Sequence, residues 1–210
     1  MVEGDAELLL IPTLAEVIGI NLEKHGISVV SVGGTGFFRY SKIFLRKDGS
    51  FIDVPVSIIT DCDVEPEKKD GVFDQKEEET TAAIVSIQDK YNAGCIRTFV
   101  APKWTFEYSV AFSCLREMLY ESILQAKKIE NSDQYALTAA KIEEINKAVA
   151  EEKAKWPSQE PCVTAYQMYH DTMLNRGNPA VKTKATSKAI VAHVCLLYSF
   201  ALFLLFSCSA

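Results

Sequence analysis

A chain of 210 residues, 48% of them apolar, is long enough to form a sizeable domain with its own core. The formal net charge of −6 argues against a protein that binds DNA through a large excess of Lys and Arg, but an acidic metal nuclease is compatible with it. The six cysteines form no C-x-x-C pair, which argues against a zinc ribbon or a disulfide framework and predicts a cytoplasmic location.

The first half of the chain alternates between helical and extended patterns. Apolar residues at helical spacing predict helices over 6–18, 38–45 and 80–91, the first of them capped by Asp5. Runs rich in β-branched residues predict strands over 27–32, 55–60 and 96–100. The polar stretch over 65–79 is expected to be a solvated loop. This alternation predicts an α/β fold with a mostly parallel sheet and flanking helices.

The second half of the chain is expected to be helical. Helices are predicted over 106–128, 135–155 and 164–174. We therefore predict a core formed by residues 1–106, a helical insertion over 107–176, a return to the core over 177–192 and an apolar tail over 193–210.

The last segment, Ala189–Ala210, is almost wholly apolar. About 20 apolar residues can span a bilayer as a helix, so a membrane anchor is one interpretation. A buried helix and an artefact of the gene model are the others. We expect no membrane association, because nothing else in the chain points to a membrane.

Acidic residues follow two of the apolar stretches. Glu3 follows the first two residues, and Asp61 and Asp63 follow the strand expected over 55–60. Because ligands bind at the carboxyl ends of the strands in open parallel sheets, these carboxylates could meet at one edge. Glu7 lies about one helical turn beyond Glu3 and could face the same place. The alternative is that the aspartates only form turns.

These motifs resemble a known family. Val2-Glu3-Gly4 followed by the D-x-D motif at 61–63 resembles the Toprim domain of topoisomerases, bacterial primases and related nucleases. The longer run over 2–12 resembles the Toprim domain of the overcoming-lysogenization-defect (OLD) family, and two further runs strengthen this likeness: Gly33-Gly34-Thr35-Gly36-Phe37 and Thr105-Phe106-Glu107-Tyr108.

The resemblance implies a Rossmann-like Toprim fold and an Mg²⁺-dependent DNA endonuclease that hydrolyses phosphodiesters with two metals, Mn²⁺ being an alternative ion. It implies metal ligands at Glu3, Glu7, Asp61, Asp63 and Glu107. Glu3, Asp61 and Asp63 would also be catalytic. Lys188 would be the basic residue near the scissile phosphate.

The family places an ATPase domain ahead of the Toprim domain. The sequence has no G-x-x-x-x-G-K-[ST] motif, so we expect that domain to be missing from this chain. Only two residues precede Glu3, which predicts a fragment of a longer protein. DNA is the expected partner, and a homodimer is left open. Two alternatives stay open: a non-catalytic Toprim fragment that acts as an interaction module, and a topoisomerase- or primase-type Toprim protein.

Overall fold

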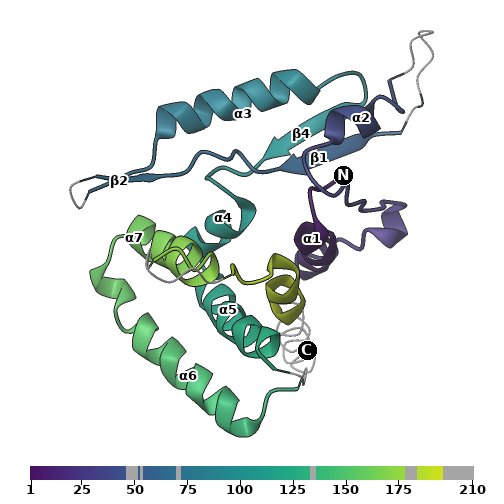
Figure 1. The fold of residues 1–210 in the computed structure, drawn as a ribbon. Coiled ribbons are helices and arrows are strands. Elements are labelled where there is room, and N and C mark those ends of the chain that lie inside the picture. Colours follow the sequence, from purple (N-terminus) through teal and green to yellow (C-terminus); the bar gives the residue numbers. More distant parts are fainter. Residues whose placement is uncertain (46–51, 53, 70–71, 133–135, 178–183, 196–210) are drawn as a thin grey trace. The chain divides into compact units, whose positions relative to one another are not determined.

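The computed structural model describes residues 1–45, 52, 54–69, 72–132, 136–177 and 184–195 (Figure 1). The chain divides into two units. Unit 1 comprises Met1–Leu8 and Leu22–Ser109, and unit 2 comprises Leu9–Asn21 and Val110–Ala210. Parallel strands with flanking helices confirm the predicted α/β class.

Parallel strands form the centre of unit 1. β1 (Val56–Thr60) pairs in parallel with β4 (Ile96–Val100) over their full length. The start of the chain extends this pair, because the Met1 amino group donates to the Ser57 carbonyl at 2.6 Å and the Ile59 N–H donates to the Met1 carbonyl at 2.9 Å. Besides this contact of Met1 with β1, Val2 forms an isolated parallel bridge with Ser31. The strand expected over 27–32 is thus reduced to a single bridge.

Side chains alternate between the two faces of the β1–β4 pair. Val56, Ile58 and Ile96 are buried, and they pack in one cluster with Phe37 and Tyr91. Those two aromatic residues belong to α2 (Phe37–Ser41) and α3 (Glu77–Tyr91), and their rings meet edge to face at 6.0 Å. Figure 1 shows α3 running along β4. The helices therefore cover one face of the pair.

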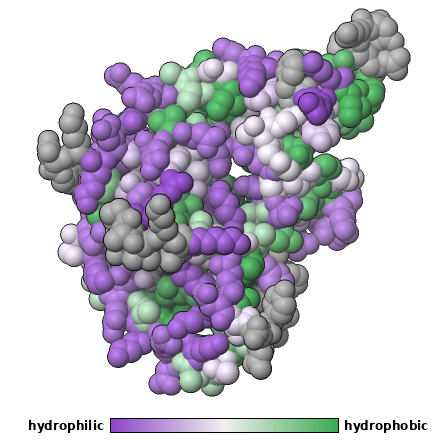
Figure 2. Space-filling model, in the orientation of Figure 1, coloured by the Kyte–Doolittle hydropathy of each residue, from purple (hydrophilic) through white to green (hydrophobic). Residues whose placement is uncertain are grey.

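The opposite face of the β1–β4 pair is exposed to solvent. Ser57, Arg97 and Phe99 lie on this face, and all three are exposed. Hydrophilic side chains prevail on the side of the molecule shown in Figure 2, and apolar side chains occur there in separate patches.

The expectation of a solvated loop over 65–79 is wrong. β2 (Glu67–Lys69) and β3 (Val72–Asp74) pair there as antiparallel strands. The next helix, α3, begins at Glu77 rather than near residue 80. Its first turn holds three glutamates, which stabilise the positive end of the helix dipole.

The remaining elements are helical. They are α1 (Asp5–Val17), η1 (Glu23–His25), α4 (Phe106–Phe112), α5 (Arg116–Glu130), α6 (Ala139–Lys153), η2 (Trp156–Ser158), α7 (Pro161–Tyr166) and the π-helical η3 (Gln167–Met173). Residues 188–195 are also helical.

The single helix expected over 106–128 is in fact two helices. The Ser113 hydroxyl accepts a hydrogen bond from the Leu115 N–H at 3.0 Å and donates one to the Val110 carbonyl at 2.7 Å. A serine that bonds to nearby backbone offers the chain an alternative to the helical ladder. The helix therefore ends at Phe112, and α5 begins at Arg116.

In unit 2, α5 and α6 pack against each other (Figure 1). Leu119, Ile123 and Ala126 recur along one face of α5, and all three are buried. Two ion pairs join the helices, Lys128 to Glu144 at 2.8 Å and Lys153 to Glu117 at 2.6 Å. Because these pairs are solvent-exposed, apolar burial contributes most of the stability here.

The described part of the apolar C-terminal segment packs in unit 2. Val191, Val194 and Cys195 are buried, and the Cys195 thiol donates to the Ser122 hydroxyl at 3.1 Å. Within the described residues, no helix is long and apolar enough to cross a membrane. Residues 196–210 of the tail lie outside the described residues. The predicted domain boundaries stay predictions.

Candidate functional site

Glu3 is held by hydrogen bonds to two separate segments. Its backbone carbonyl accepts from the Gly34 N–H at 2.8 Å. Gly34 has φ of +136°, which side chains rarely allow, so the turn after the Ser31 bridge needs a glycine there. Oε1 of Glu3 accepts from the Asp61 N–H at 3.1 Å and from the Thr60 hydroxyl. The Glu3 carboxylate therefore lies against the carboxyl end of β1.

Glu7 lies in the first turn of α1, and its side chain is 7% exposed. Its Oε2 accepts a hydrogen bond from the Gly4 N–H at 3.1 Å. This contact is the glutamate half of a capping box, in which a carboxylate in the first turn satisfies the N–H just before the helix. The sequence had suggested Asp5 as the capping residue just before the helix. The helix itself begins at Asp5, so that expectation is wrong.

Asp61 follows β1 directly, and its side chain is 8% exposed. Its Oδ1 accepts a hydrogen bond from the Phe106 N–H at 2.6 Å, at the start of α4. Helix starts leave N–H groups without intrahelical partners, and a carboxylate satisfies them well. Asp61 thereby joins the end of β1 to the segment that follows β4.

The two residues after Asp61 continue this connection. The Cys62 thiol and the Asp63 N–H both donate to the Trp104 carbonyl, at 3.5 and 2.9 Å. Asp63 has φ of +57°, and its side chain is exposed. Burial raises the pKa of the Cys62 thiol, and the charges of Asp61 and Asp63 add to the effect. Cys62 is therefore a packed thiol.

A small pocket lies beside these carboxylates at the ends of β1 and β4. Its volume is about 120 Å³. Two acidic residues, one threonine and five apolar residues line it, namely Glu7, Asp61, Thr60, Ile59, Phe99, Val100, Ala101 and Phe106. Glu7 and Asp61 thus share one pocket, and Glu3 is hydrogen-bonded to the same stretch of β1.

Glu107 is the second residue of α4, and its side chain is 3% exposed. It directly follows Phe106, whose N–H binds Asp61. Glu107 is therefore the neighbour in sequence of a residue that binds Asp61, and its role as a metal ligand stays a prediction. Thr60 was not anticipated in this network, although a threonine directly before a D-x-D motif was visible in the sequence.

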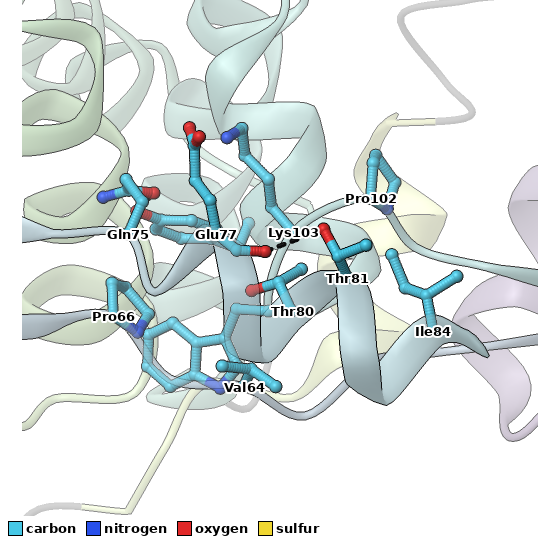
Figure 3. Close-up of a pocket in the computed structure, with 11 residues that line it drawn as sticks. Val64, Pro66, Gln75, Glu77, Thr80, Thr81, Ile84, Pro102 and Lys103 are labelled. Carbon is cyan, nitrogen blue, oxygen red and sulfur yellow. Dashed lines mark hydrogen bonds between the residues drawn. The ribbon is translucent and has the colours of Figure 1, made fainter. Parts of the chain in front are cut away.

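A second pocket in unit 1 has a volume of about 210 Å³ (Figure 3). Val64, Thr80 and Lys103 are among the residues lining it. Figure 3 shows the start of α3, with the Thr81 hydroxyl donating to the Glu77 carbonyl at 2.8 Å. Trp104 is buried, and its ring packs edge to face on Tyr108 with 5.5 Å between the ring centres.

Lys188 belongs to unit 2, as the first residue of the helix over 188–195. Its Nζ lies 5.9 Å from the centre of the Tyr169 ring, which is a cation–π distance. The carboxylates belong to unit 1, so the role predicted for Lys188 near a phosphate stays a prediction.

Within the described part of the chain, no three His, Cys, Asp or Glu side chains form a group arranged to hold a metal ion. The structure brings Glu3, Glu7 and Asp61 to one edge of the parallel pair. It does not assemble them into a finished ligand shell.

Comparisons with known proteins identify related sequences and structures. Residues 1–63 match the family model described as "Overcoming lysogenization defect protein-like, TOPRIM domain". The C-terminal region of the Burkholderia pseudomallei OLD protein is similar at 21% identity and a TM-score of 0.44, covering 94% of this chain and 85% of that chain. The C-terminal region of the Xanthomonas campestris pv. campestris OLD protein is similar at 22% identity and a TM-score of 0.44, covering 100% of this chain and 95% of that chain. No curated protein matches the sequence.

The matched segment contains Glu3, Glu7, Asp61 and Asp63, and it ends before Glu107 and Lys188. Residues 1–63 of the chain therefore match the OLD-like Toprim family, as the sequence motifs predicted.

Proposed function

We propose that this chain carries the nuclease site of an Mg²⁺-dependent DNA endonuclease of the OLD type. The observation that carries the proposal is the hydrogen bond from the Asp61 N–H to the Glu3 carboxylate. It joins the glutamate and the D-x-D motif at the carboxyl end of a parallel strand, within the segment that matches the family. Ligands of open parallel sheets bind at such ends.

The donors at this edge suit a hard cation. All of them are carboxylates, and Mg²⁺ prefers oxygen ligands, usually one or two protein carboxylates with water and phosphate oxygens completing the shell. Among the described residues no three such side chains form a group, and an ion bound by one or two carboxylates does not require one. We propose that two ions share the carboxylates, with Glu3, Asp61 and Asp63 as ligands and Glu7 and Glu107 as further ligands. Bound Mg²⁺ or Mn²⁺ would supply an activated water and stabilise the leaving oxygen.

The chain's own contribution is to orient these carboxylates. Thr60 and the Asp61 N–H hold Glu3, and the Phe106 N–H holds Asp61. A carboxylate with fixed hydrogen bonds needs little rearrangement before it binds a metal, and misplacement by about 1 Å can cost ~100-fold in rate. Lys188 is proposed to offset charge on the reacting phosphate.

The proposed partners are DNA and an ATPase domain encoded upstream, and we propose that the protein acts in the cytoplasm. Activity of the 210-residue chain by itself is expected to be weaker than that of the protein with its ATPase domain.

Plasmid nicking tests the proposal. The chain, and the longer protein with its ATPase domain, should nick DNA with Mg²⁺ or Mn²⁺ and stop when a chelator is added. Asp61→Ala and Asp63→Ala should abolish nicking, because each removes a proposed ligand. Asp89→Ala, on the exposed side of α3, is the matched control and should nick normally.

Two results would contradict this function. One is nicking at the normal rate by the double Asp61/Asp63 variant. The other is an absence of both nicking and metal binding in the longer protein, measured by calorimetry. The second result would favour the non-catalytic interaction module.

A further inference from the structure

The exposed face of the β1–β4 pair has an aromatic ring next to the proposed site. Phe99 is 57% exposed, although Ile96 and Thr98 of the same strand are buried. Exposing a ring of this size to water forgoes the free energy that burial would provide. Phe99 also lines the pocket shared by Glu7 and Asp61. The ring is therefore both accessible and adjacent to the carboxylates.

A positive charge lies on the same face. Arg97 precedes Phe99 by two residues, so both side chains leave the strand on one side, about 6.6 Å apart along it. Arg97 is exposed, and its Nη1 donates to the carbonyls of Gly94 and Ile96 at 2.9 and 2.8 Å. Within the described part of the chain its other guanidinium nitrogens have no assigned acceptor, and they can bind a phosphate.

We propose that this face binds an unpaired stretch of DNA, with one base stacked on Phe99 and a neighbouring phosphate bound by Arg97. The inference rests on the proposed function and specifies its substrate. A base can stack on a protein ring only when it has left its own stack, so the preferred substrate is single-stranded or locally unpaired DNA. The scissile phosphate would then lie toward Asp61.

The charge on this face favours a nucleic acid over a packed protein element. A helix covering Arg97 would remove its charge from water, which is costly unless a partner charge is supplied. A DNA strand supplies that charge with its phosphate and an apolar surface with its base. The polar Ser57, paired in register with Arg97, is equally suited to a hydrated, charged ligand.

Binding measurements with matched variants test this inference. The probe is a single strand of about 12 nucleotides that contains 2-aminopurine, whose fluorescence falls on stacking, measured in Ca²⁺ to limit cleavage. Phe99→Leu keeps an apolar side chain but removes the ring. It should weaken binding about 5- to 150-fold and reduce the quenching, whereas Phe99→Trp should retain both. Val85→Ala, on α3 and 50% exposed in the wild type, is the control and should change neither.

The salt dependence separates the ring from the charge. Arg97→Gln should reduce the slope of log K against log salt concentration by about 0.7, the value for one phosphate contact on a single strand. Phe99→Leu should leave that slope unchanged. A duplex of the same sequence should bind the wild type more weakly than the single strand does.

Several results would overturn the inference while leaving the nuclease proposal intact. One is equal affinity of wild type and Phe99→Leu for the single strand when Asp61→Ala still abolishes nicking. Another is a change of oligomeric state in Phe99→Leu without a change in affinity, which would identify a second copy as the partner of this face. If the wild type shows neither DNA binding nor nicking, the proposed function and this inference both fail.

Discussion

Asp61 should contribute to stability as well as to cleavage. Its carboxylate lies 2.6 Å from the Phe106 N–H at the start of α4 and is largely buried. Removing a capping side chain costs about 0.5–2 kcal/mol, and a hydrogen bond to a charged group contributes about 1.5–3 kcal/mol. Asp61→Ala leaves the Phe106 N–H without its acceptor. We therefore expect a loss of about 2 kcal/mol in the free energy of unfolding.

Asp61→Asn separates the two roles. The amide keeps an oxygen that can accept from Phe106, so the free energy of unfolding should fall by less than about 1 kcal/mol. The charge that would bind a cation is lost, so nicking should still be abolished. Urea unfolding measures the difference, since about 2 kcal/mol shifts the midpoint by roughly 1 M at a typical slope. Asp89→Ala is the control, because it removes a carboxylate from the exposed side of α3.

The reasoning would be refuted by either of two outcomes. If Asp61→Ala unfolds at the same urea concentration as the wild type, the Asp61–Phe106 hydrogen bond does not stabilise the fold. If Asp61→Asn nicks DNA at the wild-type rate, the charge of Asp61 is not needed for catalysis.

Two further predictions follow from burial and close packing. Burial raises the pKa of the Cys62 thiol above its usual value, so iodoacetamide at pH 8 should alkylate Cys62 more slowly than the exposed Cys114. Equal rates by mass spectrometry would contradict this. The unfolded chain then loses the Cys62 proton at a lower pH than the folded chain, so the free energy of unfolding should fall as the pH rises above about 9, and less so in Cys62→Ala. Gly177→Ala would place a Cβ 2.8 Å from Cβ of Asp171, which should lower the free energy of unfolding by about 1–3 kcal/mol. Gly36→Ala is the control, because its Cβ would lie 3.6 Å from the Tyr40 ring, an ordinary contact distance. Thermal unfolding should therefore be nearly unchanged in Gly36→Ala and shifted to lower temperature in Gly177→Ala.

Local sequence patterns were sufficient to locate most of the regular elements. The strands over 56–60 and 96–100 lie within one residue of their predicted limits, because runs of β-branched and aromatic residues favour extended backbone. The helix α6 lies within its predicted range, and Thr138 caps it by accepting from the Lys141 N–H. The motifs around Glu3 and Asp61 likewise pointed to the family that residues 1–63 match.

Pairing and contacts between segments decided the rest. The β2–β3 pair arises in a polar stretch because antiparallel strands satisfy each other's backbone groups, which the composition of a single strand does not reveal. The hydrogen bond from Asp61 to Glu3 joins residues 58 positions apart, and that from Phe106 to Asp61 joins residues 45 positions apart. Likewise, the residues over 96–100 predicted a strand, and only the packing of α2 and α3 on one face left the Phe99 ring exposed. A sequence pattern reports which side chains share a face, but the partner of each face depends on which segments the folded chain brings together.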